Sequence, residues 1–134
     1  MERKKEFTEV FRRLKAILQP YAKDMEVVQD DANGYFLNTQ HLMKNRRPLC
    51  FGGVRVGKNY VSFYLMSVYV TAVEMKTASP ELKKRMQGKS CFNFKTVDEK
   101  LFRELAKLTK SGASRFGDEK FIEILRKLQS PGKR

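Results

Sequence analysis

Tryptophan is absent from this chain of 134 residues, histidine occurs once, and cysteine occurs only twice. Two cysteines that lie far apart form neither a disulfide framework nor a CxxC motif, and a lone histidine supplies no zinc motif by itself. No apolar run approaches the roughly 20 residues that a membrane-spanning helix needs, and the N-terminus lacks the apolar stretch of a signal peptide. We therefore expect a cytoplasmic protein with reduced thiols, no cofactor, no metal site and no membrane partner.

Acidic residues are also scarce, because 15 of them face 28 lysines and arginines, which gives a net charge of +13. The basic excess is concentrated in residues 77–134. A surface of this kind attracts nucleic acid and other polyanions in a salt-dependent way. Solvated helix faces rich in lysine and arginine have the same composition. Nonspecific nucleic-acid binding is therefore an alternative that charge alone leaves open.

Helical periodicity occupies both ends of the chain. Residues 7–21 place apolar side chains at spacings of three and four, and Pro20 predicts the end of this helix. Residues 96–99 form a capping box ahead of a second amphipathic stretch, which we expect to stop at Gly112. A shorter apolar pattern over residues 121–128 predicts a final helix.

The middle of the chain has strand periodicity and two hairpin turns. The turns are predicted at Asn33-Gly34 and Gly57-Lys58, since these residues tolerate the backbone geometry of tight turns. The strands that the turns connect are predicted over residues 25–29 and 35–39, and over residues 49–56 and 60–66. The basic segment 40–48 is predicted to be a loop, and residues 69–73 a further short strand. The glycine pair Gly52-Gly53 inside a strand pattern indicates a β-bulge.

The segment 79–94 combines a helix with a strand. Ser79 suits the N-cap and Pro80 the first helical position, and Gly88 predicts the end of this helix. Phe92 and Phe94 alternate with polar neighbours, as in a strand with one buried face. We expect this strand to return to an edge of the sheet.

Together these elements predict an α+β fold. A sheet joined by hairpins and flanked by amphipathic helices forms a two-layer sandwich. We expect an antiparallel sheet of about five strands with the helices mainly on one face. No composition break divides residues 1–134, so a single domain is predicted.

Catalytic groups are few. Lys89 lies two residues before Cys91, and a nearby cation favours the thiolate form, but catalysis by a thiol also needs a base. His41 is the only histidine and lies in the predicted loop, and Cys50 stands between apolar residues as a small buried side chain would. An enzyme would require His41 and Cys91 to converge in space, and we expect a non-enzymatic protein instead.

The predicted strand 60–66 offers a binding surface. Val61, Phe63 and Leu65 share one face as core residues, and the opposite face carries Tyr60 and Tyr64, which suit a small organic ligand or a base. We therefore predict a binding domain that recognises a small ligand or a protein partner with one sheet face and the basic loop. The candidate ligand-binding residues are Lys44, Arg46, Arg47, Lys58, Tyr60, Tyr64 and Lys89, with His41 and Cys91 as weaker members.

The segment Ser79–Phe94 resembles a stretch shared by the bacterial YdhG-like family of domains of unknown function. Lys58–Met66, the loop Met43–Asn45 and the helix after Thr96 are similar to the same family. The resemblance covers roughly residues 5–115 and implies a small cytoplasmic α+β domain, with 116–134 as an additional C-terminal helix and tail.

One branch of that family is described as frataxin-like intracellular iron chaperones, so the resemblance makes iron delivery a further alternative. Iron needs hard oxygen ligands gathered in space. The acidic residues of the first helix are surrounded by lysines and arginines, and a surface with net charge +13 repels cations. No residue of this chain is matched to an iron ligand.

Overall fold

The computed structural model describes residues 2–42, 46, 48–66, 78–87, 91–115, 120 and 123. In chain order the elements are α1 (Glu2–Leu18), the 3₁₀ helix η1 (Gln19–Asp24), β1 (Glu26–Asp31), β2 (Gly34–Leu42), β3 (Pro48–Val56), β4 (Val61–Leu65), α3 (Pro80–Lys84), β5 (Met86–Gln87), β6 (Cys91–Phe94) and α4 (Glu99–Arg115). The predicted strand 69–73, the residues 43–45 and 47 of the predicted loop, and nearly all of the predicted helix 121–128 lie outside the described residues.

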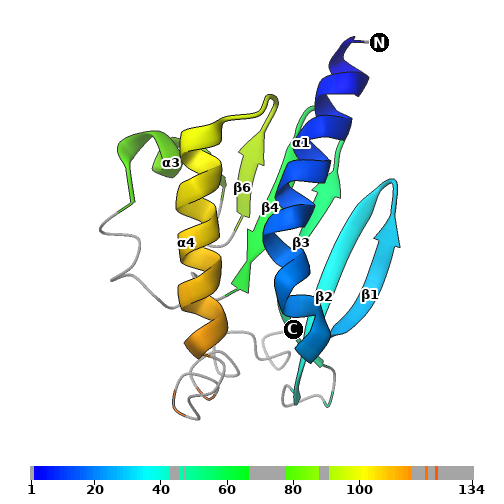
Figure 1. Cartoon of the computed structure of the whole chain (residues 1–134), viewed down its shortest axis with the longest axis vertical. Coiled ribbons are helices and arrows are strands. Elements are labelled where there is room, and N and C mark those ends of the chain that lie inside the picture. Colours follow the sequence, from blue (N-terminus) through cyan, green and yellow to red (C-terminus); the bar gives the residue numbers. More distant parts are fainter. Residues whose placement is uncertain are drawn as a thin grey trace, which may run out of the picture.

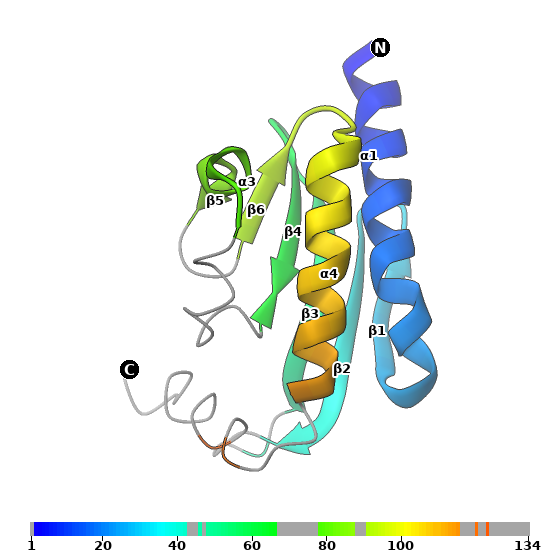
Figure 2. The same cartoon turned by 60° about the vertical axis from the view of Figure 1, so that its left-hand side comes forward.

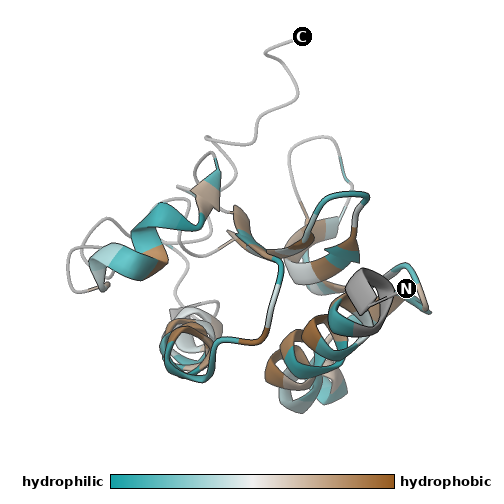
Figure 3. Cartoon of the chain, turned by 90° about the horizontal axis from the view of Figure 1, so that it is seen from above, coloured by the Kyte–Doolittle hydropathy of each residue, from teal (hydrophilic) through white to brown (hydrophobic). Residues whose placement is uncertain are grey.

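The six strands form one open antiparallel sheet in the order β1-β2-β3-β4-β6-β5. Helices α1 and α4 lie side by side on one face of this sheet (Figures 1 and 2). The view from above in Figure 3 shows both helices on the same side of the sheet, with α3 beside its β5 end. The predicted α+β fold with helices on one face is confirmed, and the described residues form six strands rather than about five. Within the described residues, no helix is long and apolar enough to cross a membrane.

The core lies between the sheet and the two long helices. Its fully buried side chains include Phe51, Phe63, Phe92 and Phe94, together with Leu14 and Leu18 from α1 and Leu101 and Leu105 from α4. Phe94 meets Phe102 of α4 edge to face, with ring centroids 5.0 Å apart. This geometry is favourable for aromatic pairs, and it fixes β6 against α4.

The predicted position of the last strand at a sheet edge is wrong. Strand β6 lies between β4 and β5, because Met86 and Gln87 pair with Phe92 and Cys91. The helix α3 ends at Lys84 and leaves residues 86–87 free to form the edge strand, so it is shorter than Gly88 predicts. Gly88 itself lies outside the described residues. Ser79 does cap α3, since its side chain accepts a hydrogen bond from the Leu82 N–H at 3.2 Å.

Three other predicted boundaries also move. The α-helix α1 ends at Leu18, and Pro20 lies inside the 3₁₀ helix that follows. Helix α4 continues past Gly112 to Arg115, because this glycine is buried on the helix face that packs on the sheet rather than exposed at a stop. The first hairpin turns one residue earlier than expected, at residues 32–33, since the Asp31 carboxylate accepts hydrogen bonds from the N–H groups of Asn33 and Gly34.

The basic segment 40–48 contains less loop than its composition predicts. Strand β2 runs to Leu42 and β3 begins at Pro48, and these two residues pair across the ladder. Between them, Arg46 has a φ of 70°, in the left-handed region that non-glycine residues rarely adopt outside tight turns. The second hairpin, around Gly57-Lys58, joins β3 to β4 as predicted.

Candidate functional site

We call the sheet surface opposite α1 and α4 the outer sheet face. Strand β4 defines it, because Val61, Phe63 and Leu65 are fully buried on the helix side while Ser62 and Tyr64 point the other way. The predicted division of this strand into two faces is confirmed. The outer sheet face also carries side chains of β2, β3, β5 and β6, and these make up the candidate site: Phe36, Arg55, Tyr60, Ser62, Tyr64, Gln87, Cys91 and Asn93.

Two aromatic rings and a guanidinium group lie together on this face. The ring centroids of Phe36 and Tyr64 are 5.9 Å apart with an interplanar angle of 37°. The guanidinium carbon of Arg55 lies 5.6 Å from the Phe36 centroid, within the range of a cation–π interaction. Both rings are half-buried, so each keeps part of its surface available to a ligand.

Gly53 makes room for the Phe36 ring. A Cβ atom at this position would lie 2.0 Å from Phe36 Cδ1 and 2.5 Å from its Cγ, which is far inside van der Waals contact. The ring therefore lies on bare backbone of the neighbouring strand, a position that only glycine permits. The predicted β-bulge is present next to the glycine pair, where the register between β2 and β3 shifts after Leu37.

A chain of hydrogen bonds extends from β4 across β6 to β5. Ser62 Oγ donates to Asn93 Oδ1 at 2.7 Å, and Asn93 Nδ2 donates to Gln87 Oε1 at 2.7 Å. Tyr60 Oη donates to the same Gln87 oxygen at 3.1 Å, and Cys91 Sγ donates to Asn93 Oδ1 at 3.4 Å. These bonds fix the orientation of both amide groups and hold polar atoms beside the aromatic pair.

Tyr64 connects the aromatic pair to this polar chain, since it pairs with Cys91 across the β4–β6 ladder. Burial raises the pKa of the Tyr64 hydroxyl, and the neighbouring Cys91 raises it further. The hydroxyl therefore stays protonated near neutral pH and can act as a hydrogen-bond donor.

Only part of the predicted site comes together on the outer sheet face. Tyr60, Tyr64 and Cys91 do, and Lys58 is exposed in the turn that precedes β4. Arg46 is exposed between β2 and β3. The remaining predicted cations, Lys44, Arg47 and Lys89, lie outside the described residues.

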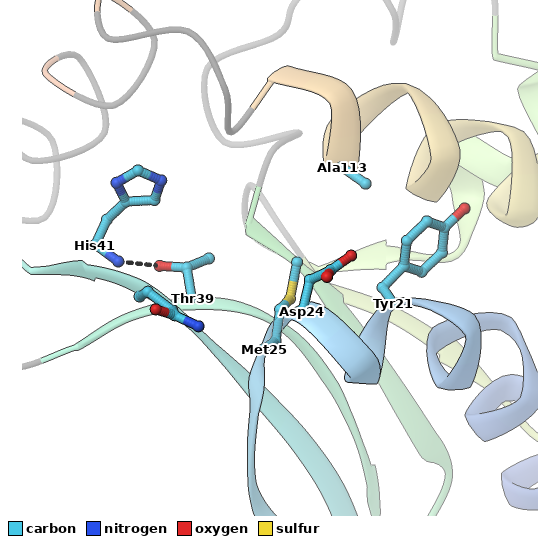
Figure 4. Close-up of a pocket in the computed structure, with 7 residues that line it drawn as sticks. Tyr21, Asp24, Met25, Thr39, His41 and Ala113 are labelled. Atoms are coloured by element: carbon cyan, nitrogen blue, oxygen red, sulfur yellow. Dashed lines mark hydrogen bonds between the residues drawn. The ribbon is translucent and has the colours of Figure 1, made fainter.

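His41 lines a different pocket, of about 390 Å³, which opens on the helix side of the sheet. Figure 4 shows its walls: Tyr21 and Asp24 come from η1, His41 from the end of β2 and Ala113 from α4. The His41 N–H donates to Thr39 Oγ1 at 3.2 Å. Two strands separate β2 from β6, and His41 lies five residues along β2 from the register of Cys91, so the two side chains are roughly 20 Å apart. They do not form a catalytic pair.

The described part of the chain contains no group of three or more histidine, cysteine, aspartate or glutamate side chains that could hold a metal ion. Several of its carboxylates are engaged with cations or with turns: Glu9 with Arg12, Glu99 with Arg13, and Asp31 with its own hairpin. The sequence predicts no set of iron ligands, and the described residues do not bring one together.

Sequence reasoning missed Phe36, Arg55 and Gln87. Phe36 stands between two core residues of β2 and resembles core in composition, and Arg55 is one arginine among many. The available signal was the Gly52-Gly53 pair, because a glycine within a strand can mark a close approach by another group as well as a bulge.

Cys50 is a structural thiol, because burial keeps its sulfur in the protonated form. Burial raises the pKa of Cys50 to about 11, and its Sγ lies 3.6 Å from the Leu37 carbonyl oxygen. At about pH 8 the thiolate fraction is therefore about a hundredfold below that of an ordinary cysteine. We expect Cys91→Ser protein, in which Cys50 is the only thiol, to react with a disulfide reagent about a hundredfold more slowly when native than when unfolded in urea. Equal rates in the two states would contradict this assignment.

Comparison with known proteins assigns no family to the chain. No family model, no curated protein and no solved structure matches it. The resemblance to YdhG-like domains therefore stays a prediction, and the function is inferred from the geometry of the candidate site itself.

Proposed function

We propose that this chain is a non-enzymatic, cytoplasmic binding domain that recognises a small planar anion on its outer sheet face. The observation that carries the proposal is the position of Arg55 over the Phe36 ring and beside Tyr64, with Gly53 beneath. Half-buried aromatic rings offer a stacking surface to a planar ligand, and a guanidinium group pairs with carboxylate or phosphate.

Contacts within the protein hold the side chains of the site in place. Gly53 seats the Phe36 ring, and the bonded chain from Ser62 to Gln87 orients the amides beside Tyr64. Side chains held in place by their neighbours lose little conformational entropy on binding. The ligand would therefore meet a preformed platform with a cation on one side and hydrogen-bonding groups on the other.

The groups around the Cys91 thiol support a non-enzymatic function. Cys91 Sγ donates to Asn93 and lies against Tyr64, neither of which is a base near neutral pH. His41 lies on the helix side of the sheet. We infer that these groups hold a ligand rather than transform it.

Nuclear magnetic resonance titration with adenosine 5′-monophosphate, flavin mononucleotide and 2-naphthoate tests the proposal. We expect at least one of these planar anions to shift the backbone amides of Phe36, Arg55 and Tyr64, and the matching neutral compound, adenosine or riboflavin, to bind about tenfold more weakly. Arg55→Gln should weaken binding about tenfold, whereas Lys58→Gln, which removes an exposed cation from the adjacent turn, should change it by less than about twofold. Shifts in other parts of the molecule, or none with any of the three anions, would contradict the proposal.

A nucleic-acid-binding function is the second candidate, and the net charge of +13 favours it. Binding of this kind rests on phosphate neutralisation, so its affinity falls steeply with salt and depends little on any one side chain. Fluorescence anisotropy with a single-stranded oligonucleotide of about 20 bases at low and high salt would measure it. Binding that survives Phe36→Ala unchanged would assign the interaction to the basic surface as a whole, while a loss would place the bases on the outer sheet face.

A further inference from the structure

A second surface lies on the helix side of the molecule, between α1 and α4. There the two helices leave a groove of about 480 Å³, lined by side chains from residues 13–21 and from residues 99–110. Ile17, Tyr21 and Phe102 give it an apolar floor, and the small side chains of Ala16 and Ala106 leave it unfilled. We call this surface the helix groove. It is separate from the candidate site on the other face of the sheet.

The helix groove is long enough for a helix to lie in it. Tyr21 lines both this groove and the pocket near His41, and Ala113 continues the α4 wall into that pocket. From Glu99 to Ala113 the α4 wall is roughly 21 Å long, which matches a helix of about 14 residues. Figure 3 shows α4 nearly end-on and α1 obliquely, both on the same side of the sheet, so a third helix could pack over the seam between them.

The charges along the helix groove are mainly positive. Arg13 donates to Glu99 at 2.7 Å and lies 6.0 Å from the centre of the Phe102 ring, so the Glu99 carboxylate, which lines the groove, is already paired. Arg103 and Lys110 are exposed on the α4 wall, and within the part of the chain that the structure describes neither forms an ion pair. An apolar floor with cations on its wall is complementary to an acidic amphipathic segment.

We propose that the helix groove docks an acidic amphipathic helix of a partner protein. Such a helix places its apolar stripe on Ile17 and Phe102 and its carboxylates against Arg103 and Lys110, the helix-in-groove mode of recognition. A second copy of this chain is the wrong occupant, because a surface with net charge +13 would bring more cations to the groove. The proposal stands independently of the ligand site on the outer sheet face.

A labelled synthetic peptide of about 14 residues, with leucines at helical spacings of three and four and glutamates elsewhere, tests this docking by fluorescence anisotropy at low salt. We expect saturable binding, and we expect the same peptide with glutamines in place of glutamates to bind about tenfold more weakly. Arg103→Glu combined with Lys110→Glu should weaken binding of the acidic peptide about tenfold or more. Lys100→Glu combined with Lys107→Glu is the matched control, since it changes the charge equally on exposed positions of the same helix outside the groove, and should cost less than about threefold.

Ala106→Phe adds a test of place, because it fills the groove at an exposed helix position without removing any charge. This substitution should weaken the binding of both peptides. Equal losses in the two double variants would overturn the proposal in favour of nonspecific charge attraction. Equal affinity for the two peptides would overturn it in favour of apolar contact without recognition of the carboxylates. Sedimentation that reveals a dimer of the chain, disrupted by Ala106→Phe, would overturn it in favour of self-association.

Discussion

Replacing Phe63 with alanine is expected to lower the free energy of unfolding by about 4 kcal/mol, because it opens a cavity at the centre of the sheet. Phe63 is fully buried, and its strand lies between β3 and β6, where Phe63 pairs with Val54 and Phe92. These neighbours belong to a continuous ladder that cannot collapse into the space. Urea unfolding, monitored by circular dichroism, measures this change. The shift of the urea midpoint gives the difference in free energy when the dependence on urea concentration is the same in both proteins.

Phe36→Ala is the matched control, since it removes the same side chain from the other face of the same sheet. Phe36 is half-buried and lies on Gly53 outside the core. We expect its removal to cost about 1 kcal/mol, in line with the smaller area returned to water, and to abolish binding of planar anions. If Phe36→Ala destabilises the protein as much as Phe63→Ala, the ring serves the core and the proposed ligand site is wrong.

The contrast between these two phenylalanines also shows what sequence reasoning could reach. The alternation of Val61, Phe63 and Leu65 along one strand identifies the core face, because strand periodicity is local and is printed in the residue order. The amphipathic patterns of α1 and α4 are local in the same way. From these elements the two-layer fold followed without knowledge of any tertiary contact.

The candidate site could not be predicted to the same depth, because it depends on the register between strands. Arg55 and Tyr64 belong to adjacent strands and Phe36 to a third, and the Phe36–Tyr64 contact exists only because Gly53 pairs with both residues. A shift by one residue would turn one of the rings to the other face. Nothing in the residue order fixes that register before the hairpins form.

The edge strand β5 could not be predicted from the sequence for a related reason. Two residues, Met86 and Gln87, are too few to show strand periodicity, so the helix signal around them dominated. Their strand is formed by pairing with β6, and the Arg85 carbonyl accepts a hydrogen bond from the Asn93 N–H at 2.8 Å. This pairing brings Gln87 to Asn93 and Tyr60, and so completes the polar half of the site.

Gly53→Ala is expected to destabilise the fold by about 2 kcal/mol and to abolish ligand binding, because the new methyl group takes the place of the Phe36 ring. The Cβ that alanine adds would overlap Cδ1, Cε1 and Cγ of that ring, so a small rotation of Phe36 cannot relieve the clash. Gly52→Ala is the comparison on the helix side of the same strand. There the obstacle is the Tyr64 carbonyl oxygen at 2.7 Å, a backbone atom that Phe36 does not influence.

A double-mutant cycle assigns the cost of Gly53→Ala to its cause. In a Phe36→Ala background the ring is gone, and the destabilisation by Gly53→Ala should fall to less than about 0.5 kcal/mol, whereas the cost of Gly52→Ala should be the same in both backgrounds. Urea unfolding of the unsubstituted protein and the five variants provides every value of the cycle. An unchanged cost of Gly53→Ala without the ring would mean that the glycine serves the strand rather than Phe36. Arg55 and Tyr64 are arranged around that ring, so the coupling energy between Gly53 and Phe36 measures how strongly the placement of the ring in the candidate site depends on the glycine.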